Sequence, residues 1–390
     1  MKPVAITAYT ATSALGRGIR PMLDALRRGA GGLKPNDFDR GELRAYIGRV
    51  AGLEDEPVTG TLAEFDCRNN RLAQIGLAED GFRDAVAKAR AKYGADRVAV
   101  LLGTSTSGIL QTELAYRARD AQGALPKDFD YRHGQNLFSM TDFVRRSLGL
   151  AGPAMTVSTA CSSSAKVFAS ASRYLESGVA DAAVVGGVDS LCLTTMHGFT
   201  SLQLVSDEPC RPFDAARRGM SIGEAAGYAL VEKSGAGPVS LLGYGESSDA
   251  YHMSTPQPEG EGALAAMRQA LDRAGLEPGT IDYVNAHGTA TPANDRAEDR
   301  ALVRLFGNRV PVSSTKGWTG HTLGAAGIVE AIVCFLALEH DFVPATLNSS
   351  AVEAGLESQI VLENRAAPLR RALSNSFGFG GSNCSLVFAE

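Results

Sequence analysis

The run Ser158-Thr159-Ala160-Cys161-Ser162-Ser163-Ser164 says more about fold and chemistry than any other stretch of the chain. A cysteine follows a turn of small residues and precedes residues 162–175, whose pattern predicts a helix. The first N–H groups of a helix are unpaired and lie at the positive end of its dipole. We therefore expect a lowered pKa for the Cys161 thiol and a nucleophilic role for it. A buried structural cysteine is the alternative.

Two histidines lie in glycine-containing turns further along the chain. His287 lies in Asn285-Ala286-His287-Gly288-Thr289, and His321 lies in Gly320-His321-Thr322. One thiol and two imidazoles in turns are typical of covalent thioester chemistry. The remaining histidines lie outside such motifs, and we assign no catalytic role to His133, His197, His252 or His340.

The composition places the chain among ordinary globular proteins and excludes several function classes. It has 390 residues, of which 44% are hydrophobic and 21% charged, enough to bury a substantial core. The net charge of -5 argues against nucleic-acid binding. The six cysteines show no Cys-x-x-Cys spacing, so we expect neither a metal site nor a disulfide framework, and a cytoplasmic location.

No segment predicts a membrane span or a secretion signal. The N-terminus enters a strand-like run almost at once and lacks the apolar core of a signal peptide. The longest apolar stretch, residues 323–338, contains Glu330 and is too short to cross a bilayer. We interpret it as a buried helix.

Strands and helices alternate along the chain, which predicts an α/β fold with largely buried sheets. One predicted helix carries Leu264, Met267 and Leu271 and ends at Gly275. Both halves, before and after about residue 240, begin with a strand and end in paired strands, which suggests a duplication. Short apolar runs predict strands at residues 4–7, 98–102, 182–187, 228–232, 239–242, 282–285, 373–377 and 385–388.

Four motifs in this order resemble those of the β-ketoacyl-[acyl-carrier-protein] synthases, the condensing enzymes of fatty-acid and polyketide synthesis. The resemblance covers residues 100–390 well and the first hundred residues weakly. The motifs are Thr159-Ala160-Cys161-Ser162-Ser163-Ser164, residues 285–295 around His287, residues 313–327 from Ser313 to Gly327, and Asn375-Ser376-Phe377-Gly378-Phe379-Gly380-Gly381-Ser382-Asn383.

The resemblance implies a thiolase-like layered αβαβα fold with two similar halves. We assign residues 1–240 to the half that carries the nucleophile and residues 241–390 to the half that carries both active-site histidines. The two halves would form one fused unit, usually a dimer.

The resemblance also implies a role for each site residue. Cys161 would take an acyl group from the phosphopantetheine thioester of a carrier protein. His287 and His321 would donate hydrogen bonds to the malonyl thioester carbonyl and help to expel carbon dioxide, after which the carbanion attacks the acyl-cysteine. Lys316 and Glu330 would organise the site electrostatically, although a purely structural ion pair is the alternative.

Further residues would shape the substrate path. The backbone N–H groups of Cys161 and Phe379 would form the oxyanion hole. The acyl pocket would be lined by Thr106, Phe199, Phe377 and Phe379, with Phe379 as a gate. Because carrier proteins are acidic, a basic patch would dock them, and the candidate residues are Arg68, Arg71, Lys127 and Arg132.

The expected reaction is the decarboxylative condensation of a cysteine-bound acyl group with malonyl-acyl carrier protein, giving a 3-oxoacyl product. The chain would need no cofactor of its own, because phosphopantetheine belongs to the carrier protein. We expect a homodimer, with a heterodimer containing a chain-length-factor homologue as the alternative.

Two departures from the family pattern favour specialised polyene or polyketide synthesis over housekeeping fatty-acid synthesis. Residues 7–12 replace the glycine-rich turn that usually ends the first strand, and residues 223–227 read Gly-Glu-Ala-Ala-Gly. A thiolase is disfavoured, because Cys384 lacks the Cys-x-Gly context of a second catalytic cysteine. A chain-length factor would lack the nucleophile. A decarboxylase without condensing activity stays open.

Overall fold

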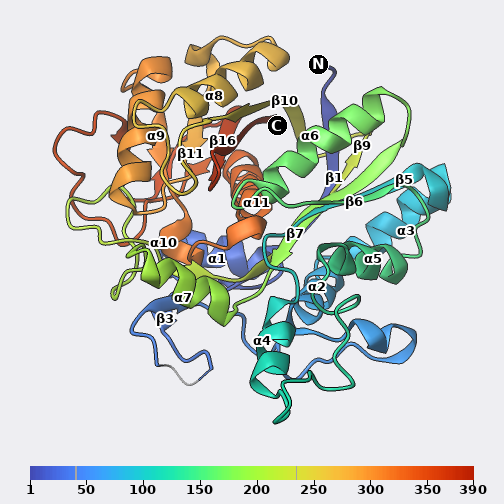
Figure 1. Ribbon diagram of the computed structural model, residues 1–390. Coiled ribbons are helices and arrows are strands. Elements are labelled where there is room, and N and C mark those ends of the chain that lie inside the picture. Colours follow the sequence, from blue (N-terminus) through green and yellow to red (C-terminus); the bar gives the residue numbers. More distant parts are fainter. Residues whose placement is uncertain (40–41, 234) are drawn as a thin grey trace.

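Apolar runs from both halves of the chain form the strands of one continuous hydrogen-bonded sheet (Figure 1). The computed structural model describes residues 1–39, 42–233 and 235–390. The first half contributes β1 (Val4–Ser13), β2 (Gly16–Arg17), β5 (Val98–Gly103), β6 (Ala154–Val157), β7 (Ala182–Asp189) and β9 (Ala225–Glu232). The second half contributes β10 (Val239–Ser248), β11 (Tyr283–Asn285), β12 (Pro311–Ser313), β14 (Gln359–Ile360), β16 (Arg371–Gly378) and β17 (Ser382–Ala389).

The strand pairing in the first half is repeated in the second. In the first half, β1 pairs antiparallel with β9, β9 antiparallel with β7, and β7, β5 and β6 run parallel. In the second half, β10, β17, β16, β11 and β12 repeat this order and these directions. An antiparallel pair of β1 and β10 joins them. The two similar halves expected from the sequence are confirmed, while the division near residue 240 stays a prediction.

Helices cover both faces of each half-sheet, which gives the layered αβαβα arrangement. The outer layer of the first half contains α2 (Arg68–Ala78), α3 (Phe82–Tyr93) and α5 (Leu137–Ser147), and that of the second half contains α8 (Glu261–Ala274) and α9 (Pro292–Phe306). The middle layer consists of α6 (Ser163–Glu176) and α11 (Ala326–Glu339). Side chains along β5 alternate between the outer and middle layers, as the period of a strand requires.

The remaining elements are short or peripheral. The helices are α1 (Ile19–Arg28), α4 (Ile109–Arg117), α7 (Leu193–Ser201) and α10 (Lys316–Thr319), with 3₁₀ turns at Gly60–Phe65, Ala95–Arg97, Pro278–Thr280 and Leu323–Ala325. Two small sheets contain β3 (Lys34–Pro35), β4 (Tyr46–Gly48) and β8 (Ile222–Gly223), and β13 (Phe342–Val343) and β15 (Arg365–Ala366). Trp318 of α10 is fully buried and donates its indole N–H to the Ala345 carbonyl at 2.9 Å.

The two middle helices lie side by side at the centre of the molecule (Figure 1). A Cβ at Gly327 would lie 2.5 Å from the Ala165 backbone nitrogen, so only glycine permits this approach. The predicted helix over residues 162–175 is confirmed as α6. The apolar stretch at 323–338 forms a 3₁₀ turn and then α11, which is buried as predicted. No helix in the described part of the chain has the length and hydrophobicity required to cross a membrane.

The first strand is longer than the sequence predicted. β1 continues through residues 7–12, where the family pattern would place a glycine-rich turn, and pairs with β9 as far as Thr12. The run consists of threonine, alanine and tyrosine, and both threonine and tyrosine favour strands. This departure therefore lengthens the strand instead of reshaping a turn.

Phe335 in α11 connects the halves, and we expect its removal to destabilise the whole fold. Its ring contacts Tyr9 of β1 and Phe388 of β17, with centroid distances of 5.2 Å and 4.8 Å. Phe335→Ala should lower the free energy of unfolding by about 3–5 kcal/mol, because a large cavity would remain between the halves. Urea unfolding measures this loss. Val179→Ala at an exposed site is the control, and a loss below about 1 kcal/mol for Phe335→Ala would contradict the assignment.

Candidate active site

Cys161 lies in a tight bend between the end of β6 and the start of α6. Ala160 has a φ of 52°, in the left-handed region that non-glycine residues rarely adopt. The following serines hold this bend: Ser162 Oγ donates to the Thr159 carbonyl at 2.9 Å, and Ser163 Oγ donates to the Ala160 carbonyl at 2.6 Å. The serine run of the motif therefore fixes the bend, which presents the thiol at the N-terminus of α6.

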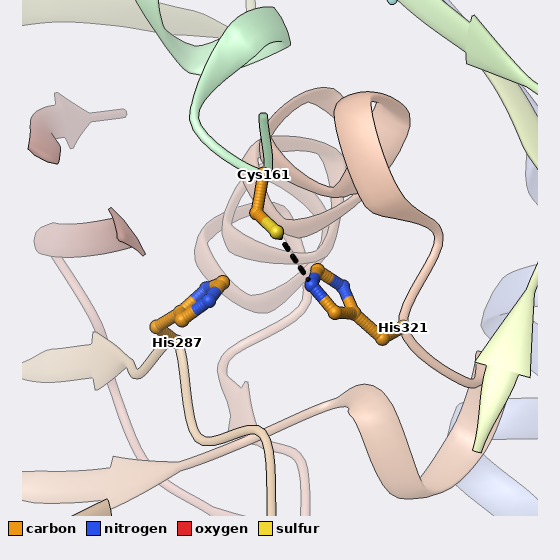
Figure 2. A group of neighbouring side chains, drawn as sticks. All are labelled: Cys161, His287 and His321. Atoms are coloured by element: carbon orange, nitrogen blue, oxygen red, sulfur yellow. Dashed lines mark hydrogen bonds between the residues drawn. The ribbon is translucent and has the colours of Figure 1, made fainter. Parts of the chain in front are cut away.

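Cys161, His287 and His321 converge at one point, although they come from three distant segments (Figure 2). His287 follows β11, and His321 lies between α10 and the turn that precedes α11. His321 Nε2 lies 2.9 Å from Cys161 Sγ, and the imidazole ring centroids are 5.3 Å apart at an angle of 84°. All three side chains are buried.

Lys316 and Glu330 complete the cluster on the side of His287. Lys316 Nζ lies 3.2 Å from His287 Nδ1 and also donates to the His287 carbonyl and to the Glu330 carboxylate. Because an ammonium group can only donate, His287 Nδ1 must accept, and Nε2 then carries the proton of the neutral ring. Burial raises the pKa of Glu330 to about 7, and Lys316 opposes this rise. The two predicted electrostatic residues therefore meet at the site.

Burial sets the protonation states of the reactive groups. It raises the pKa of the Cys161 thiol to about 12, while Lys316 and the backbone N–H of Phe379 act in the opposite direction. It also lowers the pKa of both imidazoles well below 6.5, and Lys316 adds to this effect. The expectation of a lowered thiol pKa is therefore wrong, because burial of the thiol disfavours its charged form. The resting site holds a neutral thiol and two neutral imidazoles.

The thiol and both imidazoles line a cavity of about 180 Å³. Phe199, Phe377 and Phe379 line this cavity, and the rings of Phe199 and Phe379 are 5.5 Å apart. Phe379 lies in the turn between β16 and β17, whose Gly380 adopts a left-handed conformation with φ of 81°. The three predicted pocket phenylalanines are thus brought to the thiol.

Thr106 does not line this cavity in the described part of the chain. Its hydroxyl instead donates to the buried carboxylate of Asp189 at 2.9 Å, and its backbone N–H donates to the same group. Sequence reasoning placed the Thr106 side chain in the pocket wall. The side chain belongs instead to a hydrogen-bond network around Asp189. The prediction that Thr106 lines the acyl pocket is therefore wrong for this cavity.

The four predicted docking residues have different surroundings. Arg68 is buried and pairs with Glu224 and Glu54, so its assignment to a docking surface is wrong. Arg71 is three-quarters buried and pairs with Asp66 at 2.5 Å. Lys127 and Arg132 are exposed. Sequence reasoning failed for Arg68 because its buried carboxylate partner lies more than 150 residues away.

Glu298 is a site residue that the sequence reasoning missed. Its carboxylate accepts the backbone N–H groups of His287 and Gly288, both at 2.8 Å, and the Asn375 amide at 3.2 Å. Burial raises its pKa to about 7, and these N–H groups oppose the rise. The available signal was an acidic residue on the buried face of the helix that directly follows the His287 turn.

The sulfur and one ring nitrogen of each histidine lie within 4.8 Å of one another, a grouping of ligand types that could bind a soft metal ion. The ammonium group of Lys316 next to His287 opposes a second cation at this place. Nucleophilic chemistry at the thiol, with hydrogen-bond donors facing a largely apolar cavity, fits the geometry better.

Comparisons with known proteins agree with this arrangement. Models of the N-terminal and C-terminal β-ketoacyl synthase domains match residues 1–236 and 239–350. The chain is 32% identical to 3-oxoacyl-[acyl-carrier-protein] synthase 2 of Coxiella burnetii, over 99% of this chain and 98% of that protein. It is 34% identical to the Vibrio harveyi protein of the same name, with the same coverage.

Solved structures extend the likeness to three dimensions. One chain of the complex of a ketosynthase with its chain length factor from Xenorhabdus doucetiae superposes with a TM-score of 0.91 at 37% identity, covering 100% of this chain and 98% of that one. A β-ketoacyl synthase from Burkholderia phymatum gives a TM-score of 0.89 at 27% identity, with full coverage of both chains. With its buried Cys–His–His cluster and both family domains, the chain belongs to the β-ketoacyl synthase family of condensing enzymes.

Proposed function

We propose that this enzyme loads an acyl group onto Cys161 and extends it with a malonyl unit, giving a 3-oxoacyl thioester on a carrier protein. The observation that carries this proposal is the 2.9 Å contact between Cys161 Sγ and His321 Nε2, with the His287 imidazole facing the same cavity. A thiol, a base beside it and a second imidazole are the groups that the two steps of such a condensation require.

In the first step, Cys161 takes the acyl group. Sγ attacks the thioester carbonyl carbon of the donor, and its proton passes to His321 Nε2. The backbone N–H groups of Cys161 and Phe379 stabilise the oxyanion. Breakage of the bond between carbon and the donor sulfur releases a thiolate, which recovers the proton from His321. The neutral imidazole, with its lowered pKa, suits a group that holds the proton only briefly.

In the second step, the acylated Sγ carries no proton, so the neutral His321 ring can take the tautomer with its proton on Nε2. The malonyl thioester then binds where its carbonyl oxygen meets the Nε2–H groups of His287 and His321. Loss of carbon dioxide leaves its electron pair on the neighbouring carbon, and the resulting enolate oxygen is stabilised by these donors. The carbanion attacks the acyl carbon on Cys161, a carbon–carbon bond forms, and Sγ leaves as a thiolate that regains its proton from water. Lys316 keeps the proton of His287 on Nε2 because it occupies Nδ1.

The acyl and malonyl groups would both arrive on an acidic acyl carrier protein, whose phosphopantetheine arm enters the cavity. The chain itself would need no cofactor. Of the docking residues, exposed Lys127 and Arg132 are the ones that we propose to contact the carrier protein.

Specialised polyene or polyketide synthesis is the pathway that we propose. The Xenorhabdus structure at 37% identity contains a chain length factor, and another relative at 26% identity is the ishigamide ketosynthase/chain length factor. These relatives favour a heterodimer with a chain-length-factor homologue, and a homodimer is the alternative. Six free, buried cysteines suit a reducing compartment, and we propose the cytoplasm.

Intact-protein mass spectrometry tests the proposed reaction. Incubation with acyl-carrier proteins of graded chain length should give an adduct on Cys161, which malonyl-carrier protein then discharges as a product two carbons longer. Cys161→Ala should form no adduct, because the nucleophile is gone. Labelled acyl-protein in that variant would contradict the assignment. Carbon dioxide release without a longer product would identify a decarboxylase, and activity that requires co-purified partner would identify the heterodimer.

His287→Ala should slow decarboxylation of malonyl-carrier protein by about 10²-fold or more, the scale for losing one oxyanion donor. Carbon dioxide release under saturating substrate measures this rate. Acyl transfer to Cys161 should change much less, because His321 and not His287 contacts the sulfur. His252→Ala at the mouth of the cavity is the matched control. A full rate of decarboxylation in His287→Ala would contradict its proposed role.

The pH dependence should follow from the neutral resting groups. Since both imidazole pKa values lie well below 6.5, decarboxylation should keep its rate as the pH falls from about 8 to 6.5 and decline only at lower pH. Since the thiol pKa is about 12, alkylation of Cys161 by iodoacetamide should rise about tenfold per pH unit up to about pH 9. A plateau of the alkylation rate near neutral pH would instead indicate a thiolate–imidazolium pair.

A further inference from the structure

Asp189, the last residue of β7, is a fully buried carboxylate beside the active site. Its oxygens accept hydrogen bonds from the hydroxyl groups of Thr104, Ser105 and Thr106 and from the backbone N–H groups of Ser105 and Thr106. The Gly324 backbone N–H donates to Oδ2 at 2.6 Å. Within the described residues, no lysine, arginine or histidine lies in ion-pair distance of it. Such a buried charge requires this many donors.

These bonds join two segments that are far apart in sequence. One is the loop 104–106 after β5, and the other is the turn 323–325 between His321 and α11. A Cβ at Gly324 would lie 2.6 Å from the Ser105 nitrogen and 2.7 Å from Asp189 Oδ2, so the two segments meet without spare room. Leu323 has a φ of 54°, an unfavourable conformation that the surroundings must hold.

Among the described residues, no hydrogen bond fixes the His321 ring at Nδ1, the nitrogen that does not contact Cys161. His321 Nδ1 is buried and has no hydrogen-bond partner among the described residues. In many enzymes, a partner at this nitrogen sets the tautomer and the direction of the ring. Here the ring direction depends on the backbone of its turn. One side of the turn is held by the His321 backbone, whose N–H donates to the Ser221 carbonyl at 2.7 Å and whose carbonyl accepts the Gly223 N–H of β8 at 2.9 Å.

We propose that Asp189 is a positioning residue that holds the other side of this turn and thereby keeps His321 Nε2 against Cys161 Sγ. The Thr-Ser-Thr loop at 104–106 supplies the donors that fix the carboxylate in place, which explains why Thr106 turns away from the cavity. The inference rests on the proposed function, in which His321 accepts the proton of the Cys161 thiol.

A purely electrostatic effect of Asp189 would have the opposite sign. The negative charge of Asp189 opposes formation of the Cys161 thiolate and so helps to raise the thiol pKa. Removal of that charge alone should therefore speed alkylation of the thiol. Loss of the His321 contact should slow it, because the base beside the sulfur is displaced.

The test compares alkylation rates of Cys161 by iodoacetamide, followed by peptide mass spectrometry, in the wild type and in Asp189→Asn. An amide cannot accept all these N–H groups, and we expect the rate to fall about tenfold, in the range typical of coupled hydrogen-bond networks. In a His321→Ala background, the same substitution should no longer slow alkylation. An unchanged or faster rate in Asp189→Asn, or an equal slowing in both backgrounds, would overturn the proposal.

Asp214→Asn is the matched control. Asp214 is also a buried carboxylate and accepts the backbone N–H groups of Ala216, Ser350 and Ala351. Asp214→Asn should leave the alkylation rate of Cys161 unchanged, and it measures the general effect of losing a buried, hydrogen-bonded carboxylate. If Asp189→Asn does not fold, Thr104→Val removes one donor and should slow alkylation about threefold, within the same range; an unchanged rate would overturn the proposal.

The same variants separate this inference from the proposed function. Alkylation needs no substrate, so it measures the role of Asp189 even if the wild type forms no condensation product, a result that would remove only the proposed function. With substrate, Asp189→Asn should lower kcat of acyl transfer to Cys161 and leave KM for the acyl-carrier protein within about twofold, because the donor carbonyl contacts the backbone N–H groups of Cys161 and Phe379 and not His321. A raised KM with unchanged kcat would contradict a positioning role.

Discussion

The contact between α6 and α11 is the constraint on which the active site depends. One helix begins at the nucleophile and the other begins just after His321, and the two pack so closely that Gly327 has no room for a side chain. Ser164 Oγ accepts the Ile328 backbone N–H at 3.0 Å, which fixes their relative position along the axis. The half-sheets on either side bury this pair, so the position of the thiol relative to the imidazole follows from the core of the protein.

The same burial decides the electrostatics of the site. Desolvation penalises every charge, so it raises the thiol pKa and lowers the imidazole pKa values, and all three groups favour their neutral forms. Lys316 and Glu330 contact each other, and this contact opposes the rise in the Glu330 pKa that burial causes. The three reactive groups are thus neutral and face a largely apolar space, and the pair of Lys316 and Glu330 lies beside them. Hydrogen-bond donors act more strongly in such a space than in water.

Much of this arrangement could be predicted from sequence, and the reasons for success and failure are physical. The cluster of Cys161, His287 and His321 was found, together with Lys316, Phe377 and Phe379, because each of these residues lies in a long local motif. Glu330 and Phe199 lie outside the motifs and were assigned from the family resemblance alone. The buried strands and α11 were found because uninterrupted apolar runs require burial.

The failures concern properties that a local motif does not contain. The pKa of Cys161 depends on desolvation by the whole fold, and the burial of Arg68 depends on Glu224, which lies between β8 and β9. Thr106 and Glu298 were misjudged or missed because their partners, Asp189 and the His287 backbone, come from other segments. The fully buried Trp318 shows a practical benefit of such long-range packing. It is the only tryptophan of the chain and lies two residues from Lys316, so the intrinsic fluorescence of this enzyme originates beside its reactive centre.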